Sequence, residues 1–462
     1  MEKHQTSELP LRREAQPGPS DRPVSRSRGI LVSFLAFIFF SSLLHPTTRC
    51  HHPVQKLYDH CRPHTIEQRV KTILTTTPLI DGHNDLAILI RFLYNNQIYG
   101  KKFTEPFEKG GMPAHVDLPR LREGLNGGAF WSVFTPCPEN GTDWSDENYA
   151  ASVQFTLHQI DLMTRLEQAY PRDFSGLPLG SRGAWAAFDD GKLVSPLGIE
   201  GLHQIGNSAS NLRRFHALGV RYATLTHNCG NKYADAALQE NPVKVAKPHW
   251  GGVSPAGKLL VNEMNRIGML VDLSHVSADT MRHVLGARDD WAGSKAPVMF
   301  SHSSAHAICP HPRNVPDDVL QLVKKTNSIV MVNFAPDFVS CTKSDNEDGM
   351  PDFFPDNSTL AHVVDHITYI GGLIGYDHVG LGSDFDGIEA TPEGLDDVSK
   401  YPDLIAELLR RGVSDKDAGK IAGGNILRVW RDAEEVAAKL QADGEPVLED
   451  DLPSLFAPST HA

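Results

Sequence analysis

The sequence has no excess of positive charge and no glycine-rich nucleotide-binding pattern. Its 462 residues include 57 Asp and Glu against 44 Lys and Arg, which gives a formal net charge of −13. Proteins that grip phosphate backbones do so with a surplus of Lys and Arg, so this balance argues against a nucleic-acid partner. Neither GxGxxG nor GxxxxGK(S/T) occurs, and we therefore predict no nucleotide site.

Cysteine pairs with the CxxC spacing of zinc-binding motifs are also absent. None of the six cysteines belongs to a CxxC pair, which argues against a zinc knuckle and against a thioredoxin-like redox motif. An even number of widely spaced cysteines permits three disulfides and agrees with an exported protein.

Long apolar runs are nearly absent, and the one exception lies near the N-terminus. Residues 30–44 (ILVSFLAFIFFSSLL) are apolar, and at about 1.5 Å per residue they would form about 22 Å of helix, short of a hydrocarbon core of roughly 30 Å. Arg22, Arg26 and Arg28 precede this run, so we expect residues 1–29 to be a disordered cytoplasmic or leader segment. Residues 30–45 are then a signal-peptide core or a signal anchor, with a buried core helix as the alternative.

This segment predicts entry into the secretory pathway. The protein would be a single-pass membrane protein with an extracellular or lumenal main domain, or a secreted protein if the segment is cleaved. Asn140-Gly-Thr and Asn357-Ser-Thr are then acceptor sites for N-glycosylation. The acidic tail, residues 436–462, has no apolar end, so we expect no C-terminal lipid anchor.

One pattern recurs between residues 66 and 435: a short β-branched or apolar run, a polar residue or glycine, and then a segment of helical composition. The runs are 79–80 (ending at 81–85), 129–134, 194–199, 222–226, 269–273, 298–300, 329–334 and 379–381. Eight strands alternating with helices favour a parallel (β/α)8 barrel of the TIM type over residues 66–435. A doubly wound open sheet is the alternative on periodicity alone.

Polar side chains follow most of these runs. They are His83 and Asp85, Glu200, His227, His275, His302 and Asp384, in chain order. A single histidine at a strand end is more often a hydrogen-bonded core residue than a ligand. However, in a barrel the carboxyl ends of all strands meet on one face, where active sites are built, so these imidazoles and carboxylates would share one pocket.

Nitrogen and carboxylate donors without thiolate suit catalytic zinc or a similar divalent ion. The set exceeds what one tetrahedral ion needs, so we predict a pair of ions about 3.5 to 4 Å apart. Glu200 stands on the strand between the His83/Asp85 group and the His275/His302 group, which is the place for a carboxylate shared by both ions.

These motifs resemble those of the membrane (renal-type) dipeptidases, zinc metallopeptidases of the M19 type with a barrel fold of the metallo-dependent hydrolase kind. The matching segments run in the family's order from about residue 66 to 432. They are 80–85 (IDGHND), 198–201 (GIEG), 224–229 (TLTHNC), 271–277 (VDLSHVS), 300–304 (FSHSS), 313–318 (RNVPDD) and 382–387 (GSDFDG).

The resemblance implies two Zn²⁺ ions and a dipeptide substrate. It implies that His83 and Asp85 bind one ion, that His275 and His302 bind the other, and that Glu200 bridges them. It also implies that His227, Arg313 and Asp384 contact the substrate. We expect hydroxide from a zinc-acidified water to attack the scissile carbonyl.

In that scheme three residues act on the substrate itself. His227 would stabilise the oxyanion and Asp384 would carry the proton to the leaving amine, which makes both of them catalytic. The guanidinium of Arg313 suits a free C-terminal carboxylate, which favours short peptides over long chains.

The resemblance further implies disulfides between Cys137 and Cys229 and between Cys309 and Cys341, which leaves Cys50 and Cys61 for each other. The sequence departs from the family in two places. Tyr233 stands where animal members usually have Trp nearby, and an acidic insert occupies residues 343–357. We expect both departures to touch the rim of the pocket.

A zinc dipeptidase is therefore the leading hypothesis, acting on a wide range of dipeptides and forming a membrane contact through the N-terminal segment if it stays uncleaved. A homodimer is compatible with the sequence. The alternatives are a related barrel amidohydrolase acting on another amide or ester, and a non-catalytic cell-surface binding protein.

Overall fold

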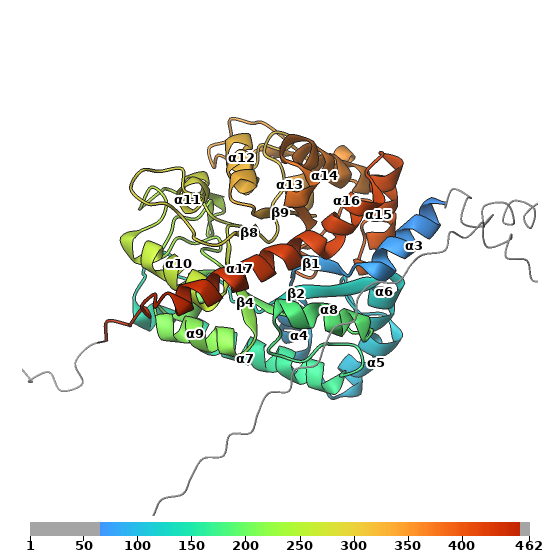
Figure 1. The fold of residues 1–462 in the computed structure, drawn as a ribbon, viewed down its shortest axis with the longest axis horizontal. Coiled ribbons are helices and arrows are strands. Elements are labelled where there is room, and N and C mark those ends of the chain that lie inside the picture. Colours follow the sequence, from blue (N-terminus) through green and yellow to red (C-terminus); the bar gives the residue numbers. More distant parts are fainter. Residues whose placement is uncertain (1–64, 453–462) are drawn as a thin grey trace, which may run out of the picture. The chain divides into compact units, whose positions relative to one another are not determined.

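The computed structural model of the protein describes residues 65–452, which contain a closed barrel of parallel strands (Figure 1). The strands follow one another around the barrel in chain order. They are β1 (Leu79–Asn84), β2 (Asn126–Ser132), β3 (Leu197–Glu200), β4 (Val220–Thr224), β7 (Leu270–Asp272), β8 (Met299–Phe300), β9 (Ile329–Val332) and β12 (Val379–Leu381). Every predicted run overlaps one of these strands, so the (β/α)8 barrel is confirmed and the open sheet is wrong.

At least one helix follows each barrel strand, as the βα repeat requires. The helices are α3 (Ile66–Thr76), α4 (Leu86–Tyr94), α5 (Lys101–Lys109), α6 (Leu118–Glu123), α7 (Asp146–Ala169), α8 (Ser181–Asp189), α9 (Ala209–Ala217), α10 (Pro255–Ile267), α11 (Ala278–Val284), α12 (Asp317–Lys325), α13 (Pro336–Val339), α14 (Leu360–Ile374), α15 (Tyr401–Arg410), α16 (Asp415–Gly419) and α17 (Asn425–Ala442).

Local signals in the sequence set several of the helix ends. The hydroxyl groups of Ser145, Ser208 and Thr359 accept hydrogen bonds from backbone N–H groups in the first turns of α7, α9 and α14. Gly268 ends α10 with a φ of 78°, a left-handed conformation that costs glycine little. Two residues later β7 begins, so the cap turns the chain from helix into strand.

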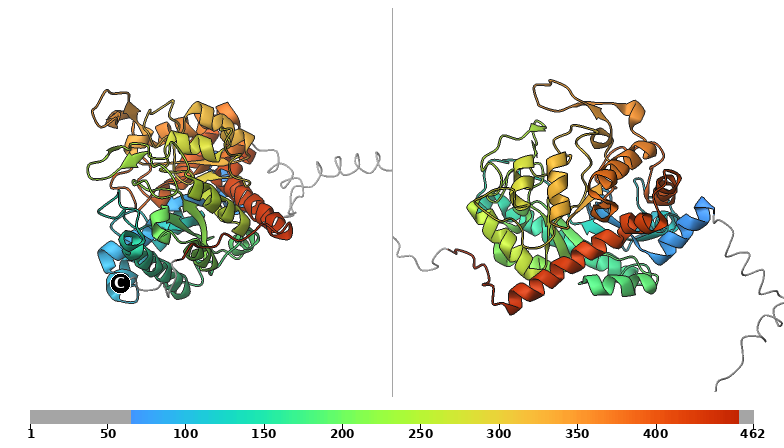
Figure 2. Two further views of the ribbon diagram at one scale, coloured as in Figure 1. Left: turned by 90° about the vertical axis from the view of Figure 1, so that its left-hand side faces the viewer. Right: turned by 45° about the horizontal axis from the view of Figure 1, so that its top comes forward.

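The core has two apolar layers. One layer lies between the strands and the surrounding helices and includes Leu404 and Leu408 of α15, both fully buried. The other fills the barrel interior, where the ring of Phe130 lies 5.4 Å from that of Trp430 on α17. Helix α17 runs across the barrel (Figure 2), and Asn425 at its start donates to the carbonyl of Val379 at the beginning of β12. The amino-terminal end of the barrel is therefore closed by apolar packing, and the opposite end is left for polar side chains.

Two loops at strand ends carry small antiparallel sheets. One contains β5 (Leu238–Gln239) and β6 (Lys244–Val245), and the other contains β10 (Cys341–Thr342) and β11 (Asp352–Phe353). The second sheet is formed by the acidic insert and its flanks. Helix α17 continues past residue 435, where we expected the domain to end.

Within residues 65–452, no helix combines the length and the apolar composition needed to span a bilayer. The predicted signal segment, residues 30–45, lies outside the described residues, as do the 1–29 leader, Cys50 and Cys61. Predictions about them stay predictions.

Candidate metal centre and active site

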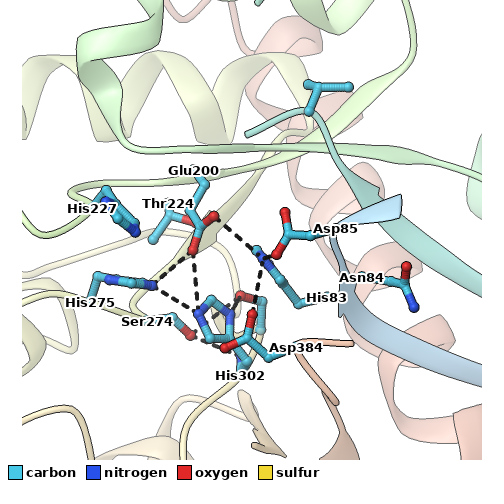
Figure 3. Close-up of polar contacts among 12 residues, drawn as sticks. His83, Asn84, Asp85, Glu200, Thr224, His227, Ser274, His275, His302 and Asp384 are labelled. Atoms are coloured by element: carbon cyan, nitrogen blue, oxygen red, sulfur yellow. Dashed lines mark hydrogen bonds and ion pairs between the residues drawn. The ribbon is translucent and has the colours of Figure 1, made fainter. Parts of the chain in front are cut away.

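The seven polar residues predicted at strand ends lie together at the carboxyl end of the barrel (Figure 3). His83 is on β1, Glu200 is the last residue of β3, and Asp85 directly follows β1. His227, His275, His302 and Asp384 lie two or three residues beyond β4, β7, β8 and β12. Strands far apart in the chain therefore deliver their donors to one place, because parallel strands share a direction.

Glu200 lies between two groups of donor atoms. Its Oε1 is 2.8 Å from Nε2 of His275 and 3.4 Å from Nε2 of His302. Its Oε2 is 3.4 Å from Nε2 of His83, which is itself 3.1 Å from Oδ2 of Asp85. Each group offers three donor atoms within 4.8 Å of one another, and Glu200 belongs to both.

The spacing and orientation of these donors fit metal ions. Ligands of a tetrahedral ion with Zn–N bonds of about 2.05 Å lie about 3.3 Å apart, close to the distances from Glu200. His275 donates from Nδ1 to Oδ1 of Asn228 at 2.9 Å, so its Nε2 carries a lone pair. That lone pair faces Nε2 of His302 at 2.9 Å.

His302 presents a lone pair as well. Its Nδ1 lies 2.8 Å from Oγ of Ser301, whose hydroxyl donates to Asp272 and can only accept from the histidine. Two lone pairs at this distance repel each other unless a cation lies between or beside them. Outer partners of this kind are typical of metal-binding histidines, because they fix the ring and its tautomer.

Charge at the centre also favours cations. Burial holds the pKa values of His275 and His302 well below the ordinary value, so both rings are neutral and available as ligands. Burial acts in the same direction on His83, but the nearby Tyr222, Glu200 and Asp85 outweigh it and raise the pKa of His83 well above the ordinary value. The carboxylates of Glu200 and Asp85 thus favour positive charge at the nitrogen of His83 that faces both of them.

Asp384 lies at the edge of this centre. Its Oδ1 is 3.9 Å from Nε2 of His83, and burial raises the pKa of Asp384 to about 7. The residue has a φ of 66°, and His275 has a φ of 65°. Such left-handed conformations are unfavourable for residues other than glycine, and strained backbone of this kind clusters at functional sites.

Arg313 lies in the loop between β8 and α12 and is buried there, and within residues 65–452 its side chain has no hydrogen-bond partner. Its residue is 2% exposed, and neither Nε nor Nη2 has a hydrogen-bond partner among the described residues. The guanidinium packs 5.0 Å from the ring centre of Phe338, and burial lowers the pKa of Arg313 to about 10. A buried cation without an acceptor is costly, so this place suits an anionic group that residues 65–452 do not supply.

One cavity of about 430 Å³ joins these groups. It is lined by Asp85, Glu200, His227, His275, Arg313 and Asp384, together with the apolar rings of Phe134 and Phe338. The volume is in the range of small-molecule sites. The centre can therefore hold metal ions at its floor and a small anionic ligand against Arg313.

The family model of the membrane dipeptidases, peptidase family M19, matches residues 67–444. The chain belongs to this family.

Curated relatives and solved structures agree with this assignment. The dipeptidase aclJ of Aspergillus oryzae is 46% identical over 446 residues, covering 95% of this chain and 97% of the relative. An uncharacterised dipeptidase of Schizosaccharomyces pombe is 45% identical over 392 residues, covering 83% of this chain and 87% of the relative. A metallopeptidase structure from Rhodobacter sphaeroides, liganded with a phosphinate mimic of the dipeptide L-Ala-D-Ala, superposes with a TM-score of 0.62 at 25% identity. It covers 77% of this chain and 99% of that chain.

The two disulfides that the resemblance implied are present. Cys137 pairs with Cys229, and Cys309 pairs with Cys341. The first disulfide ties the loop after β2 to the residue two positions beyond His227, so it anchors one wall of the cavity.

The sequence argument missed the residues that hold the ligands in place. Tyr222 contacts Nδ1 of His83 at 2.7 Å, Asn228 contacts His275, and Asp272 contacts Ser301 behind His302. All three residues lie inside or next to the quoted motifs, and this proximity is the only feature of the sequence that could have pointed to them. The expectation about the pocket rim was wrong for Tyr233, which is buried in the apolar core, and the 343–357 insert does not line the 430 Å³ cavity either.

Proposed function

We propose that this protein is a zinc-dependent dipeptidase that hydrolyses the peptide bond of dipeptides in the 430 Å³ cavity. One observation carries the proposal: the cavity contains both the double donor cluster around Glu200 and the buried, unpartnered guanidinium of Arg313. The first feature suits hydrolytic metal ions, and the second suits a free carboxylate. The dipeptide mimic bound by the Rhodobacter sphaeroides relative supports the same substrate class.

Two Zn²⁺ ions would be held by the residues that resemblance and geometry assign. His83 and Asp85 would hold one ion, His275 and His302 the other, and Glu200 would be shared by both. When bound, the ions supply Lewis acidity toward the scissile carbonyl and lower the pKa of the attacking water.

The remaining residues act on the substrate. Arg313 would bind the C-terminal carboxylate and so place the single peptide bond over the donor cluster. His227 would face the carbonyl oxygen, where an imidazole N–H stabilises the charge that develops there. Asp384 would give the leaving amine its proton, and a carboxyl with a pKa of about 7 is suited to accept and donate a proton near neutral pH.

Export of the protein is a second proposal. Two disulfides in the described part of the chain support an oxidising compartment, and Asn140 and Asn357 are exposed as glycan acceptors must be. A shift in electrophoretic mobility after treatment with a glycosidase tests it, and N140Q and N357Q are the matched controls. An unshifted band from the natural host would contradict glycosylation at these sites.

The decisive experiment for the enzymatic proposal combines activity and metal content in one sample. A panel of dipeptides is assayed with the purified protein while bound zinc is quantified. We expect hydrolysis, about two ions per chain, and loss of activity with a chelator that added Zn²⁺ restores. H83A and E200A should abolish hydrolysis while the fold is kept, because the ligands stand on rigid strand ends. Wild-type rates in either variant would contradict the metal assignment.

A further inference from the structure

We propose that Glu240 is a positioning residue of this site, which holds the ring of His227 directly and the ring of His275 through Asn228. The inference deepens the proposed function and rests on it for the roles of the two histidines. No sequence motif pointed to Glu240, which lies beyond the end of the TLTHNC segment. Its position emerges only from the folded loop between β4 and α10.

The direct contact joins Oε1 of Glu240 to Nδ1 of His227 at 3.2 Å. The imidazole is enclosed on other sides as well: Phe134 meets it edge-on with ring centres 5.0 Å apart, and Sγ of Cys137 is 3.6 Å from the same Nδ1. Because Nδ1 faces the carboxylate, Nε2 is the nitrogen left for a substrate. Glu240 therefore selects which edge of the ring His227 presents to the cavity.

The indirect contact runs through Asn228. Its Oδ1 accepts from Nδ1 of His275 at 2.9 Å, and the neighbouring Asn228 side chain lowers the pKa of the Glu240 carboxyl. The backbone N–H of Glu240 in turn donates to the carbonyl of Asn228 at 3.1 Å. The rings of His227 and His275 lie side by side, with centres 4.4 Å apart. The Glu240 carboxylate thus supports both the ring of His227, which faces the substrate, and the ring of His275, which is a proposed metal ligand.

Glu240 is itself held firmly. It follows β5, which pairs with β6, and the N–H of Ala237 just before β5 donates to the carbonyl of His275 at 2.7 Å. Burial raises the pKa of the Glu240 carboxyl, but hydrogen bonds from His227 and Asn228 outweigh that effect and hold the pKa below its ordinary value. The group is therefore a carboxylate at neutral pH, and its oxygens can accept from a histidine N–H.

Loss of such an outer partner typically lowers metal affinity or activity by about 10- to 100-fold. In E240A the His227 ring is free to rotate, so it meets the reacting carbonyl less often. Binding of the substrate carboxylate at Arg313 is untouched. We therefore expect kcat to fall by about 10- to 100-fold and KM to stay within about twofold of the wild-type value.

Three variants test this on a dipeptide substrate. E240A removes the acceptor, E240Q keeps an acceptor oxygen without the charge, and E139Q is the matched control. Glu139 is exposed in the same loop as Cys137, and E139Q, like E240Q, removes one negative charge near the site. E240Q should recover most of the kcat lost in E240A, and E139Q should equal wild type. A wild-type kcat in E240A, or an E240Q variant as slow as E240A, would overturn positioning by hydrogen bonding.

Zinc affinity gives a readout that does not depend on turnover. In competition with a chromogenic chelator, E240A and N228A should each weaken the binding of one of two ions by about tenfold or more, whereas E139Q should not. If the wild-type protein hydrolyses no dipeptide, the proposed function fails, and this measurement alone decides about Glu240. Unchanged zinc affinity in both variants would then refute its role.

Discussion

Replacing Arg313 with methionine should strongly reduce dipeptide hydrolysis and leave the protein as stable as before or more stable. Burial lowers the pKa of Arg313 from 12.5 to about 10, and at about 1.4 kcal/mol for each pH unit this corresponds to about 3 kcal/mol against the charged form in the folded state. The penalty applies in full below pH 10, where both folded and unfolded chains hold the proton. A neutral side chain removes it, and loses only the packing on Phe338.

The same change removes the partner of the substrate carboxylate. Truncating one member of a buried, hydrogen-bonded charge pair costs about 2 to 5 kcal/mol, which is about a 30- to 5,000-fold loss in kcat/KM. The assay compares a dipeptide with the same dipeptide carrying a C-terminal amide. Wild-type enzyme should prefer the free acid strongly, and R313M should treat both nearly alike.

Arg266 provides the matched control, because it is a partly buried arginine whose Nε and Nη2 are both paired. Its Nε and Nη2 donate to Glu263 at 2.7 and 2.8 Å. R266M should therefore lower the thermal stability and keep the activity, the reverse of R313M. Retained preference for the free acid in R313M, or a fall in its unfolding temperature like that of R266M, would refute carboxylate recognition by Arg313.

Two further predictions concern buried carboxyl groups. D384N should lower kcat by about 100- to 10,000-fold with zinc content unchanged, as measured by metal analysis of the same samples, and a loss confined to KM would contradict proton transfer by Asp384. Neither carboxyl oxygen of Glu167 has a hydrogen-bond partner in the described part of the chain, and burial raises its pKa to about 9 from an ordinary 4.5. Unfolding therefore releases a proton between these pH values, so this carboxyl destabilises the fold progressively as the pH rises. E167Q should be more stable than wild type by about 3 kcal/mol at pH 7, with the difference vanishing near pH 4.5 in thermal unfolding scans. A constant difference across this range would show that Glu167 does not titrate in this way.

Several contacts that orient the proposed metal ligands could not be predicted, because they join residues far apart in the chain. Tyr222 and His83 are 139 positions apart, and Asn228 and His275 are 47 positions apart. No local pattern encodes such a distance. The packing of Trp430 against the amino-terminal end of the barrel was equally hard to predict. In the sequence, Trp430 looks like any apolar core residue of a helix, and only the path of α17 across the barrel places it there.

The sequence by itself determined the alternation of strands and helices and the placement of imidazoles and carboxylates at the carboxyl ends of β1, β3, β4, β7, β8 and β12. It could do so because strand and helix periodicity are local, and because strands that run in parallel must end on one face. Only the tertiary structure decided that Glu200 turns one oxygen to each donor group, that Arg313 is buried without a partner among residues 65–452, and that Glu240 reaches His227. These facts depend on the paths of the loops, and a loop's path is fixed by long-range packing rather than by its own residues.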